Sequence, residues 1–116
     1  MSAETSVLAQ LMAVIEDRKA NPPAKSYTTT LFQGGVERIG FKIMEEAAEV
    51  ARAAGKSEES AEARGDLIHE AADLIYHVFV MLGYRNVPLR EVENELARRF
   101  GISGLDEKAA RTNPSS

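Results

Sequence analysis

The stretch that decides the fold is K-I-M-E-E-A-A-E-V-A-R-A-A, which runs from residue 42 to residue 54. Its three carboxylates, those of Glu45, Glu46 and Glu49, stand among alanines and larger apolar residues. Because a helix turns about 100° per residue, all three project from one arc of roughly a quarter turn. Glu45 and Glu49 lie one turn apart, where like charges repel at a cost of a few tenths of a kcal/mol. A divalent cation is the simplest explanation for this crowding.

A second stretch repeats the feature on an otherwise apolar helical pattern. Asp66, Glu70, Asp73 and His77 recur there at positions i, i+4, i+7 and i+11, so they share one side of a helix. Short connections make the two helices neighbours, and Glu46-x-x-Glu49 can then face Glu70-x-x-Asp73. Four carboxylates directed into one space are tolerable only if they are protonated or neutralised.

The remaining segments predict an all-α chain, a four- to five-helix bundle-like subunit whose central helices pair antiparallel. We expect an ordered loop over 25–35, because this segment is rich in hydroxyl side chains and ends in Gly34-Gly35. Thr5 or Ser6 is the expected cap of the first helix, and Ser57 or Ser60 that of the third. Residues 1–116 read as a single domain with a polar tail, 101–116, that frays at its end. The helices are expected at 5–19, 36–54, 60–82 and 88–100.

Composition excludes several classes of protein. A chain of 116 residues has room for one domain with a modest core, so oligomerisation would help its stability. A net charge of −4 gives no electrostatic footprint for nucleic acid, and the absence of cysteine excludes disulfides and thiolate zinc sites. No apolar run approaches the roughly 18 residues of a membrane span, and the first residues do not resemble a signal peptide. A cytoplasmic protein is the resulting expectation.

The acidic residues favour a metal that prefers oxygen ligands. Carboxylates alone suit Mg²⁺, or Mn²⁺, and Mg²⁺ commonly shares its shell with substrate phosphates, which points to a nucleotide or diphosphate ligand. Lys42 lies one turn before Glu46 and could reach a phosphate, and Arg38 lies one turn further back. The hydroxyls and the lysine of segment 25–28 could hold an anion ahead of a helix, although a plain surface connection is the commoner use of such a segment.

Simpler interpretations compete with a metal site. Charged helix faces are usually only solvated, but a Glu-x-x-Asp inside an apolar helix makes that reading less favourable here. His69 and His77 are weak signals, since a single histidine on a core-facing helix is more often a hydrogen-bonded packing residue. Tyr76 is read in the same way, as a buried ring whose hydroxyl has a partner. A di-iron centre would require Glu-x-x-His on paired helices, which the chain lacks.

Several segments carry a resemblance to a known family. E-E-x-x-E followed by E-x-x-D on the next helix resembles the all-α nucleoside triphosphate pyrophosphohydrolase superfamily, and within it the phosphoribosyl-ATP pyrophosphatases. The matching segments are S-Y-T at 26–28, K-x-x-E-E-x-x-E at 42–49, E-A-A-D-L-I-Y-H-x-x-V-M-L at 70–82, L-A-R-R at 96–99 and S-G-L-D-E-K-A-A-R at 103–111. The resemblance covers nearly the whole chain. It implies Mg²⁺-dependent hydrolysis of the α–β phosphoanhydride of phosphoribosyl-ATP to phosphoribosyl-AMP and pyrophosphate, the second step of histidine biosynthesis.

The resemblance also implies roles for individual residues. Glu46, Glu49, Glu70 and Asp73 become metal ligands, and Glu45 becomes a further ligand or the base that deprotonates the attacking water. Lys42 would hold phosphate, and Arg38 is a weaker candidate, since residues 36–38 stand where the family often carries lysines. The residues expected near substrate are Lys25, Ser26, Tyr27 and Thr28.

The superfamily implies a homodimer or higher homo-oligomer in which helices of partner chains complete a bundle. Two other functions stay open on the sequence. One is a house-cleaning pyrophosphohydrolase that acts on free (d)NTPs with the same metal chemistry. The other is a non-catalytic helical dimerisation module that binds a structural cation.

Overall fold

The computed structural model describes residues 6–101, which form four helices and contain no strand. They are α1 (Val7–Ala20), α2 (Tyr27–Lys56), α3 (Ala61–Tyr84) and α4 (Leu89–Phe100). The all-α prediction is confirmed. The predicted tail beyond residue 101, with its S-G-L-D-E-K-A-A-R segment, lies outside the described residues. The chain divides into two compact units after Asn86.

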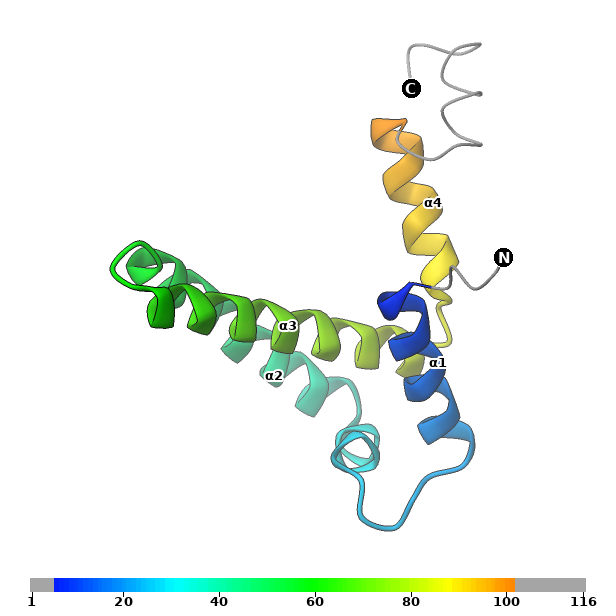
Figure 1. Ribbon diagram of the computed structural model, residues 1–116. Coiled ribbons are helices and arrows are strands. Elements are labelled where there is room, and N and C mark those ends of the chain that lie inside the picture. The colour runs from blue at the N-terminus through cyan, green and yellow to red at the C-terminus, as the bar shows by residue number, and fades with distance from the viewer. Residues whose placement is uncertain (1–5, 102–116) are drawn as a thin grey trace. The chain divides into compact units, whose positions relative to one another are not determined.

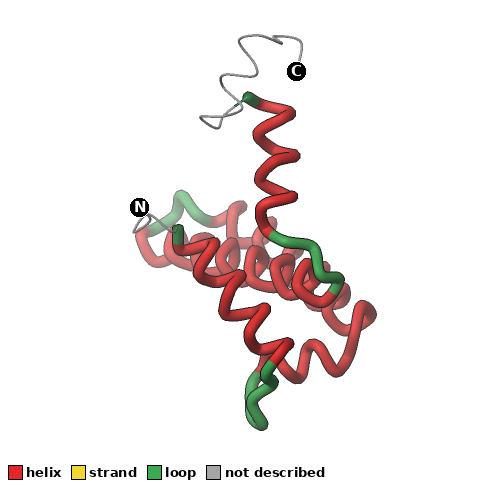
Figure 2. The backbone as a smooth tube through the Cα atoms, turned by 90° about the vertical axis from the view of Figure 1, so that its right-hand side faces the viewer, coloured by secondary structure: helices red, strands yellow, loops and turns green. Residues whose placement is uncertain are grey.

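The first unit is built on the long pair α2 and α3, which pack against each other along their lengths with α1 beside one end (Figure 1). The tube view shows the short connection at the other end, where α2 turns back into α3 (Figure 2). Ser60 caps α3 by accepting a hydrogen bond from the Ala63 backbone N–H at 3.0 Å. This short, capped turn makes the pair antiparallel, as the sequence predicts.

The start of α2 corrects the expected loop over 25–35. The Ser26 hydroxyl caps the helix by accepting from the backbone N–H of Thr29, and helical structure begins at Tyr27. Thr28, Thr29 and Leu31 are buried, so tertiary packing overrides the β preference of the threonines. Gly35 then breaks the helix with φ +68°, a conformation that residues with a side chain rarely adopt.

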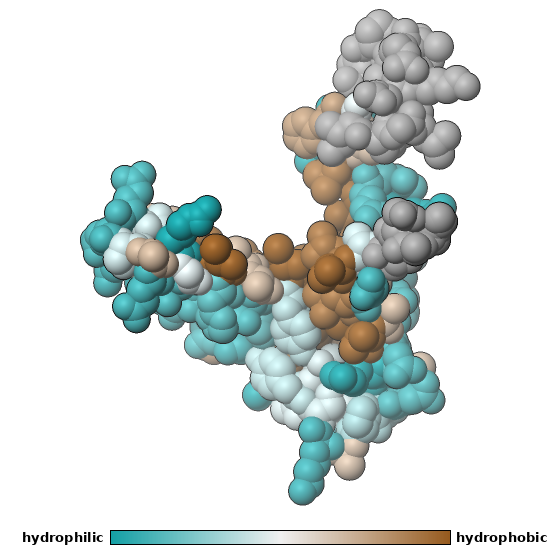
Figure 3. All heavy atoms as spheres, viewed as in Figure 1, coloured by the Kyte–Doolittle hydropathy of each residue, from teal (hydrophilic) through white to brown (hydrophobic). Residues whose placement is uncertain are grey.

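The core of this unit lies where α1 meets α2 and α3. Its fully buried side chains are those of Ile15, Leu31, Ile39 and Val80. Gly83 allows close packing there, because an added Cβ would lie 3.0 Å from Cγ2 of Ile15. In the space-filling view the apolar residues gather around α1 and along the visible face of α3, whereas the tip of the pair is hydrophilic (Figure 3).

The polar end of α3 is tied to α1 by one lysine. Lys19 Nζ donates to the carbonyl oxygens of Gly83 (3.2 Å) and Tyr84 (2.8 Å) and to Oδ1 of Asn86 (2.8 Å). Carbonyls at a helix C-terminus have no partner within the helix, so this ammonium group satisfies two of them. Lys19 thus joins the ends of two helices.

The second unit contains α4, which begins after Pro88 and ends at Gly101 in a left-handed conformation. On this helix Glu95 accepts hydrogen bonds from Arg98 (2.6 Å) and Arg99 (2.8 Å). The two guanidinium groups hold the pKa of Glu95 at about 2. The ends of α4 agree with the helix predicted at 88–100 to within a residue.

Candidate metal centre and nucleotide site

Three of the predicted acidic residues meet across the α2–α3 pair. Glu46 comes from α2, and Glu70 and Asp73 come from successive turns of α3. Each offers one carboxylate oxygen, and these oxygens all lie within 4.8 Å of one another. The three side chains, which we call the carboxylate cluster, are partly covered rather than fully solvated.

The electrostatics of the carboxylate cluster favour a cation. Oε1 of Glu46 is buried and has no hydrogen-bond partner among residues 6–101, which is costly for a charged oxygen. Loss of hydration, followed by the neighbouring Glu46 carboxyl, raises the pKa of Glu70. The donor set consists only of carboxylate oxygens, as Mg²⁺ and Mn²⁺ prefer. These residues therefore fit a hard divalent cation.

The other two glutamates of the motif lie outside the carboxylate cluster. Glu49 pairs with Arg52 at 2.8 Å and lines, together with Glu70, a hollow of about 260 Å³. Arg52 and Lys56 add positive charge to that hollow. Glu45 is half-exposed and accepts a hydrogen bond from Lys42 Nζ at 2.9 Å.

Lys42 stands beside the carboxylate cluster, and Arg38 precedes it on α2. Lys42 Nζ lies 3.9 Å from Oε2 of Glu46, in addition to its bond with Glu45. That hydrogen bond raises the pKa of Lys42, so the ammonium group keeps its charge. Arg38 is exposed and has no hydrogen bond or ion pair with any residue between 6 and 101.

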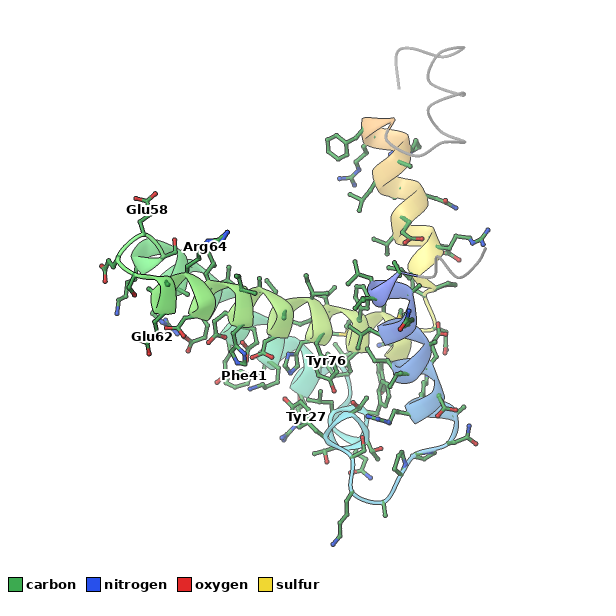
Figure 4. All side chains as sticks on the ribbon, viewed as in Figure 1. Tyr27, Phe41, Glu58, Glu62, Arg64 and Tyr76 are labelled. Atoms are coloured by element: carbon green, nitrogen blue, oxygen red, sulfur yellow. The ribbon has the colours of Figure 1, made fainter. Side chains whose placement is uncertain are left out.

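The S-Y-T segment begins α2 and is fixed against α3. Thr28 and Tyr76 share a hydrogen bond between their hydroxyl groups. The Tyr76 hydroxyl therefore has a partner, as the sequence predicts, and that partner is Thr28. Tyr27 and Tyr76 lie close together in Figure 4, with ring centroids 6.2 Å apart and an interplanar angle of 23°. Burial raises the pKa of Tyr27. Ser26 is used as the helix cap, and Lys25 is exposed just before it.

His77 connects this segment to the carboxylate cluster. Its Nδ1 lies 2.8 Å from the Asp73 carbonyl oxygen, and its Nε2 lies 2.9 Å from the Tyr27 hydroxyl. Because a carbonyl oxygen only accepts, Nδ1 carries a proton and donates it to the Asp73 carbonyl, while Nε2 shares a hydrogen bond with the Tyr27 hydroxyl. His77 is buried, which confirms that it is a hydrogen-bonded packing residue.

Some residues around the site are not singled out by the sequence. Arg52 and Lys56 occupy ordinary helix positions, and their proximity to Glu70 appears only once α3 is folded back. Arg18 reads as a cation at the end of α1, yet it lines a hollow with the S-Y-T segment. Only the spacing of three residues, about one turn, between Glu49 and Arg52 gives a signal in the sequence.

Comparison with known proteins agrees with these features. The family model described as phosphoribosyl-ATP pyrophosphohydrolase matches residues 8–100. The phosphoribosyl-ATP pyrophosphatase of Rhodopirellula baltica is 50% identical over 104 residues, which cover 90% of this chain and 85% of that protein. Proteins of the same name from Geotalea daltonii and Rhodobacter capsulatus are 45% and 46% identical, and the matches cover 90% and 91% of this chain and 94% and 98% of theirs. The chain belongs to the phosphoribosyl-ATP pyrophosphohydrolase family.

Proposed function

We propose that this chain hydrolyses the α–β phosphoanhydride of phosphoribosyl-ATP, in a reaction that requires Mg²⁺ and yields phosphoribosyl-AMP and pyrophosphate. This would make it the second enzyme of histidine biosynthesis, and we place it in the cytoplasm. The observation that carries the proposal is the carboxylate cluster, together with relatives that share both its sequence and the name phosphoribosyl-ATP pyrophosphatase. None of the described helices is both long and apolar enough to cross a membrane.

Glu46, Glu70 and Asp73 would hold the cation, and Glu49 stands one turn from Glu46 as a further ligand. Bound Mg²⁺ would polarise the phosphoryl oxygens and lower the pKa of a bound water. Mn²⁺ suits the same oxygens. The unpartnered oxygen of Glu46 supports this assignment, because it is the atom with most to gain from a cation.

Lys42 and Glu45 would act on the phosphates and on the attacking water. Lys42 keeps its charge beside the carboxylate cluster and can turn from Glu45 to a phosphate oxygen. Glu45 lies outside the group of three, so it is the candidate to accept the proton of the attacking water. Arg38 has no partner within the described residues and is a second candidate for phosphate.

The test is pyrophosphate release from phosphoribosyl-ATP, with ATP and a panel of dNTPs beside it, in Mg²⁺ and in EDTA. We expect turnover that is confined to phosphoribosyl-ATP and lost in EDTA. Turnover of free triphosphates instead would move the chain to nucleotide house-cleaning. No turnover of any substrate would favour the non-catalytic module with a structural cation.

We also propose that a homodimer, or a higher homo-oligomer, covers the exposed apolar residues of the α2–α3 pair. Phe41, Met44 and Ile68 are 62%, 73% and 60% exposed, an unusual state for large apolar side chains on central helices. Figure 4 shows Phe41 on the long pair, away from α1. That the chain is a single domain stays a proposal, supported by one family model that matches residues 8–100.

Sedimentation of wild type and of Met44→Glu tests this assembly. We expect a dimer or larger species for wild type and a monomer with unchanged helicity for Met44→Glu. A wild-type monomer at high concentration would contradict the proposal.

A further inference from the structure

A second hollow lies on the side of the molecule where α1 meets the start of α2. It encloses about 440 Å³, large enough for part of a nucleotide, and differs from the hollow beside Glu49 in both place and lining. No residue of the carboxylate cluster lines it. The lining comes from α1, the connection after it, the S-Y-T segment and one residue of α3: Leu11, Val14, Ile15, Arg18, Pro23, Lys25, Ser26, Tyr27, Thr28 and Tyr76.

Two cations on its wall have no partner. Arg18 and Lys25 make no hydrogen bond or ion pair with any other residue in the described range 6–101. Lys19, the neighbour of Arg18, is by contrast bonded to three oxygens. The Arg18 side chain is partly covered, and its planar guanidinium group can bind a doubly charged anion such as phosphate through two N–H donors.

The rest of the lining suits a sugar or a base. Leu11, Val14 and Pro23 form an apolar surface, and the stacked rings of Tyr27 and Tyr76 form an aromatic one. Such a wall binds the flat or apolar faces of a ligand, while a few polar groups fix its orientation. An inorganic ion has no apolar or flat face to place against this wall.

A chain of hydrogen bonds connects the hollow to the backbone of the carboxylate cluster. Tyr27 lines the hollow, and its hydroxyl is hydrogen-bonded to Nε2 of His77, whose Nδ1 is hydrogen-bonded to the Asp73 carbonyl oxygen. Burial raises the pKa of the Tyr27 hydroxyl, and Lys42 and Glu46 both lie near enough to influence that pKa. These contacts place Tyr27 between the hollow and the carboxylate cluster.

We infer that this hollow receives the phosphoribosyl group of the substrate, with its terminal phosphate on Arg18 and Lys25, while the triphosphate lies at the carboxylate cluster. The inference rests on the proposed function. Phosphoribosyl-ATP differs from ATP only by that group, so selection between them requires a second anion-binding place away from the metal. Arg18 and Lys25 are then specificity-determining residues that take no part in the bond cleavage.

The experiment compares wild type with Arg18→Met, Lys25→Met and Arg18→Lys. KM and kcat are measured for phosphoribosyl-ATP, and competitive inhibition constants are measured for phosphoribosyl-AMP and for AMP. The control is Arg64→Met, since Arg64 is an exposed arginine on α3 that lines a different hollow (Figure 4). Far-UV circular dichroism checks that each variant is folded.

For Arg18→Met we expect KM for phosphoribosyl-ATP to rise roughly 10- to 100-fold, the effect of a lost charge-assisted hydrogen bond, with kcat nearly unchanged. Inhibition by phosphoribosyl-AMP should weaken by a similar factor, and inhibition by AMP by less than about twofold. Lys25→Met should show a smaller change in the same direction, and Arg18→Lys should recover part of the loss. Arg64→Met should match wild type.

Equal weakening of phosphoribosyl-AMP and AMP would overturn the inference, because the hollow would then hold a part common to both. Unchanged constants in Arg18→Met and Lys25→Met would overturn it as well. If Arg18→Met does not fold, the Lys25→Met result decides, since Lys25 is exposed before the first turn of α2. Wild type that does not hydrolyse phosphoribosyl-ATP would refute the proposed function itself, a result distinct from these.

Discussion

The side chains at the two ends of the α2–α3 pair differ in how deeply they are buried. Beside α1, side chains such as Ile15, Ile39 and Val80 are completely enclosed. From Phe41 to Tyr76, by contrast, no side chain is buried, and this half carries Glu46, Glu70 and Asp73. One end supplies the stability of the unit and the other presents its chemistry. Sites that must bind and release ligands commonly lie in the less stable part of a fold.

The largest effect should come from the exposed half. Asp73→Asn or Glu46→Gln should lower the turnover of phosphoribosyl-ATP by about a thousandfold or more, because each removes a charged ligand from a site that acts through charge. The control is Glu16→Gln, which alters an exposed glutamate of α1 without a partner among residues 6–101. Steady-state pyrophosphate release measures the change, and circular dichroism should show unaltered helicity. Retained turnover in both variants would refute the assignment of the metal ligands.

A pair of isoleucines compares the two ends directly. Ile39→Ala, at a fully enclosed position, should lower the free energy of unfolding by about 2–5 kcal/mol through the cavity it creates. Ile68→Ala, at a position 60% exposed in the single chain, should cost less than about 0.5 kcal/mol within the subunit. Its effect should appear instead as weaker self-association of the folded subunits, measured by sedimentation over a range of protein concentrations. Equal losses of unfolding free energy in the two variants, independent of protein concentration, would contradict this difference between the two ends.

Removing the hydrogen bonds of Lys19 between α1 and α3 should have an intermediate effect on the free energy of unfolding. Lys19→Met keeps an unbranched apolar side chain but removes the ammonium group, which leaves the carbonyls of Gly83 and Tyr84 without their donor. We expect a loss of about 1–2 kcal/mol in urea unfolding. Arg85→Met is a matched control, since Lys19 and Arg85 both lie over the Tyr84 ring but Arg85 donates no side-chain hydrogen bond within the described chain. Equal effects in the two variants would assign the stabilisation to the ring contact.

The smallest effect concerns pH in the absence of metal. Because the pKa of Glu70 is raised by lost hydration and by Glu46, the folded protein favours its protonated form. The stability that this carboxyl contributes is therefore complete below its ordinary pKa and is lost as pH rises through the raised value. In EDTA, thermal unfolding from about pH 4 to about pH 7 should show this decline, and Glu70→Gln should reduce it. A wild-type profile identical to that of Glu70→Gln would show that the carboxyls do not interact.

The helices, and the meeting of Glu46, Glu70 and Asp73, can be predicted because both depend on local spacing. The fourth expected carboxylate, that of Glu49, lies outside this group and pairs with Arg52. The i, i+3 and i+4 pattern places Glu46 opposite Glu70 and Asp73 once a short turn joins the helices. It fails at residues 27–33, where burial of Thr28 and Leu31 outweighs local preference.

Contacts between distant segments are also beyond local spacing. The bond of Lys19 to the end of α3 and the position of Arg18 beside the S-Y-T segment depend on how α1 packs. The sequence alone reads both residues only as cations that complement the end of their own helix.

Mn²⁺ titration of the substrate-free protein, followed by the electron paramagnetic resonance signal of the free ion, tests the central claim most directly. We expect wild type and Glu16→Gln to bind Mn²⁺ and to release it on addition of Mg²⁺, and Glu46→Gln to bind it far more weakly. Equal binding by wild type and Glu46→Gln would contradict the claim that the exposed half of the α2–α3 pair is a metal centre.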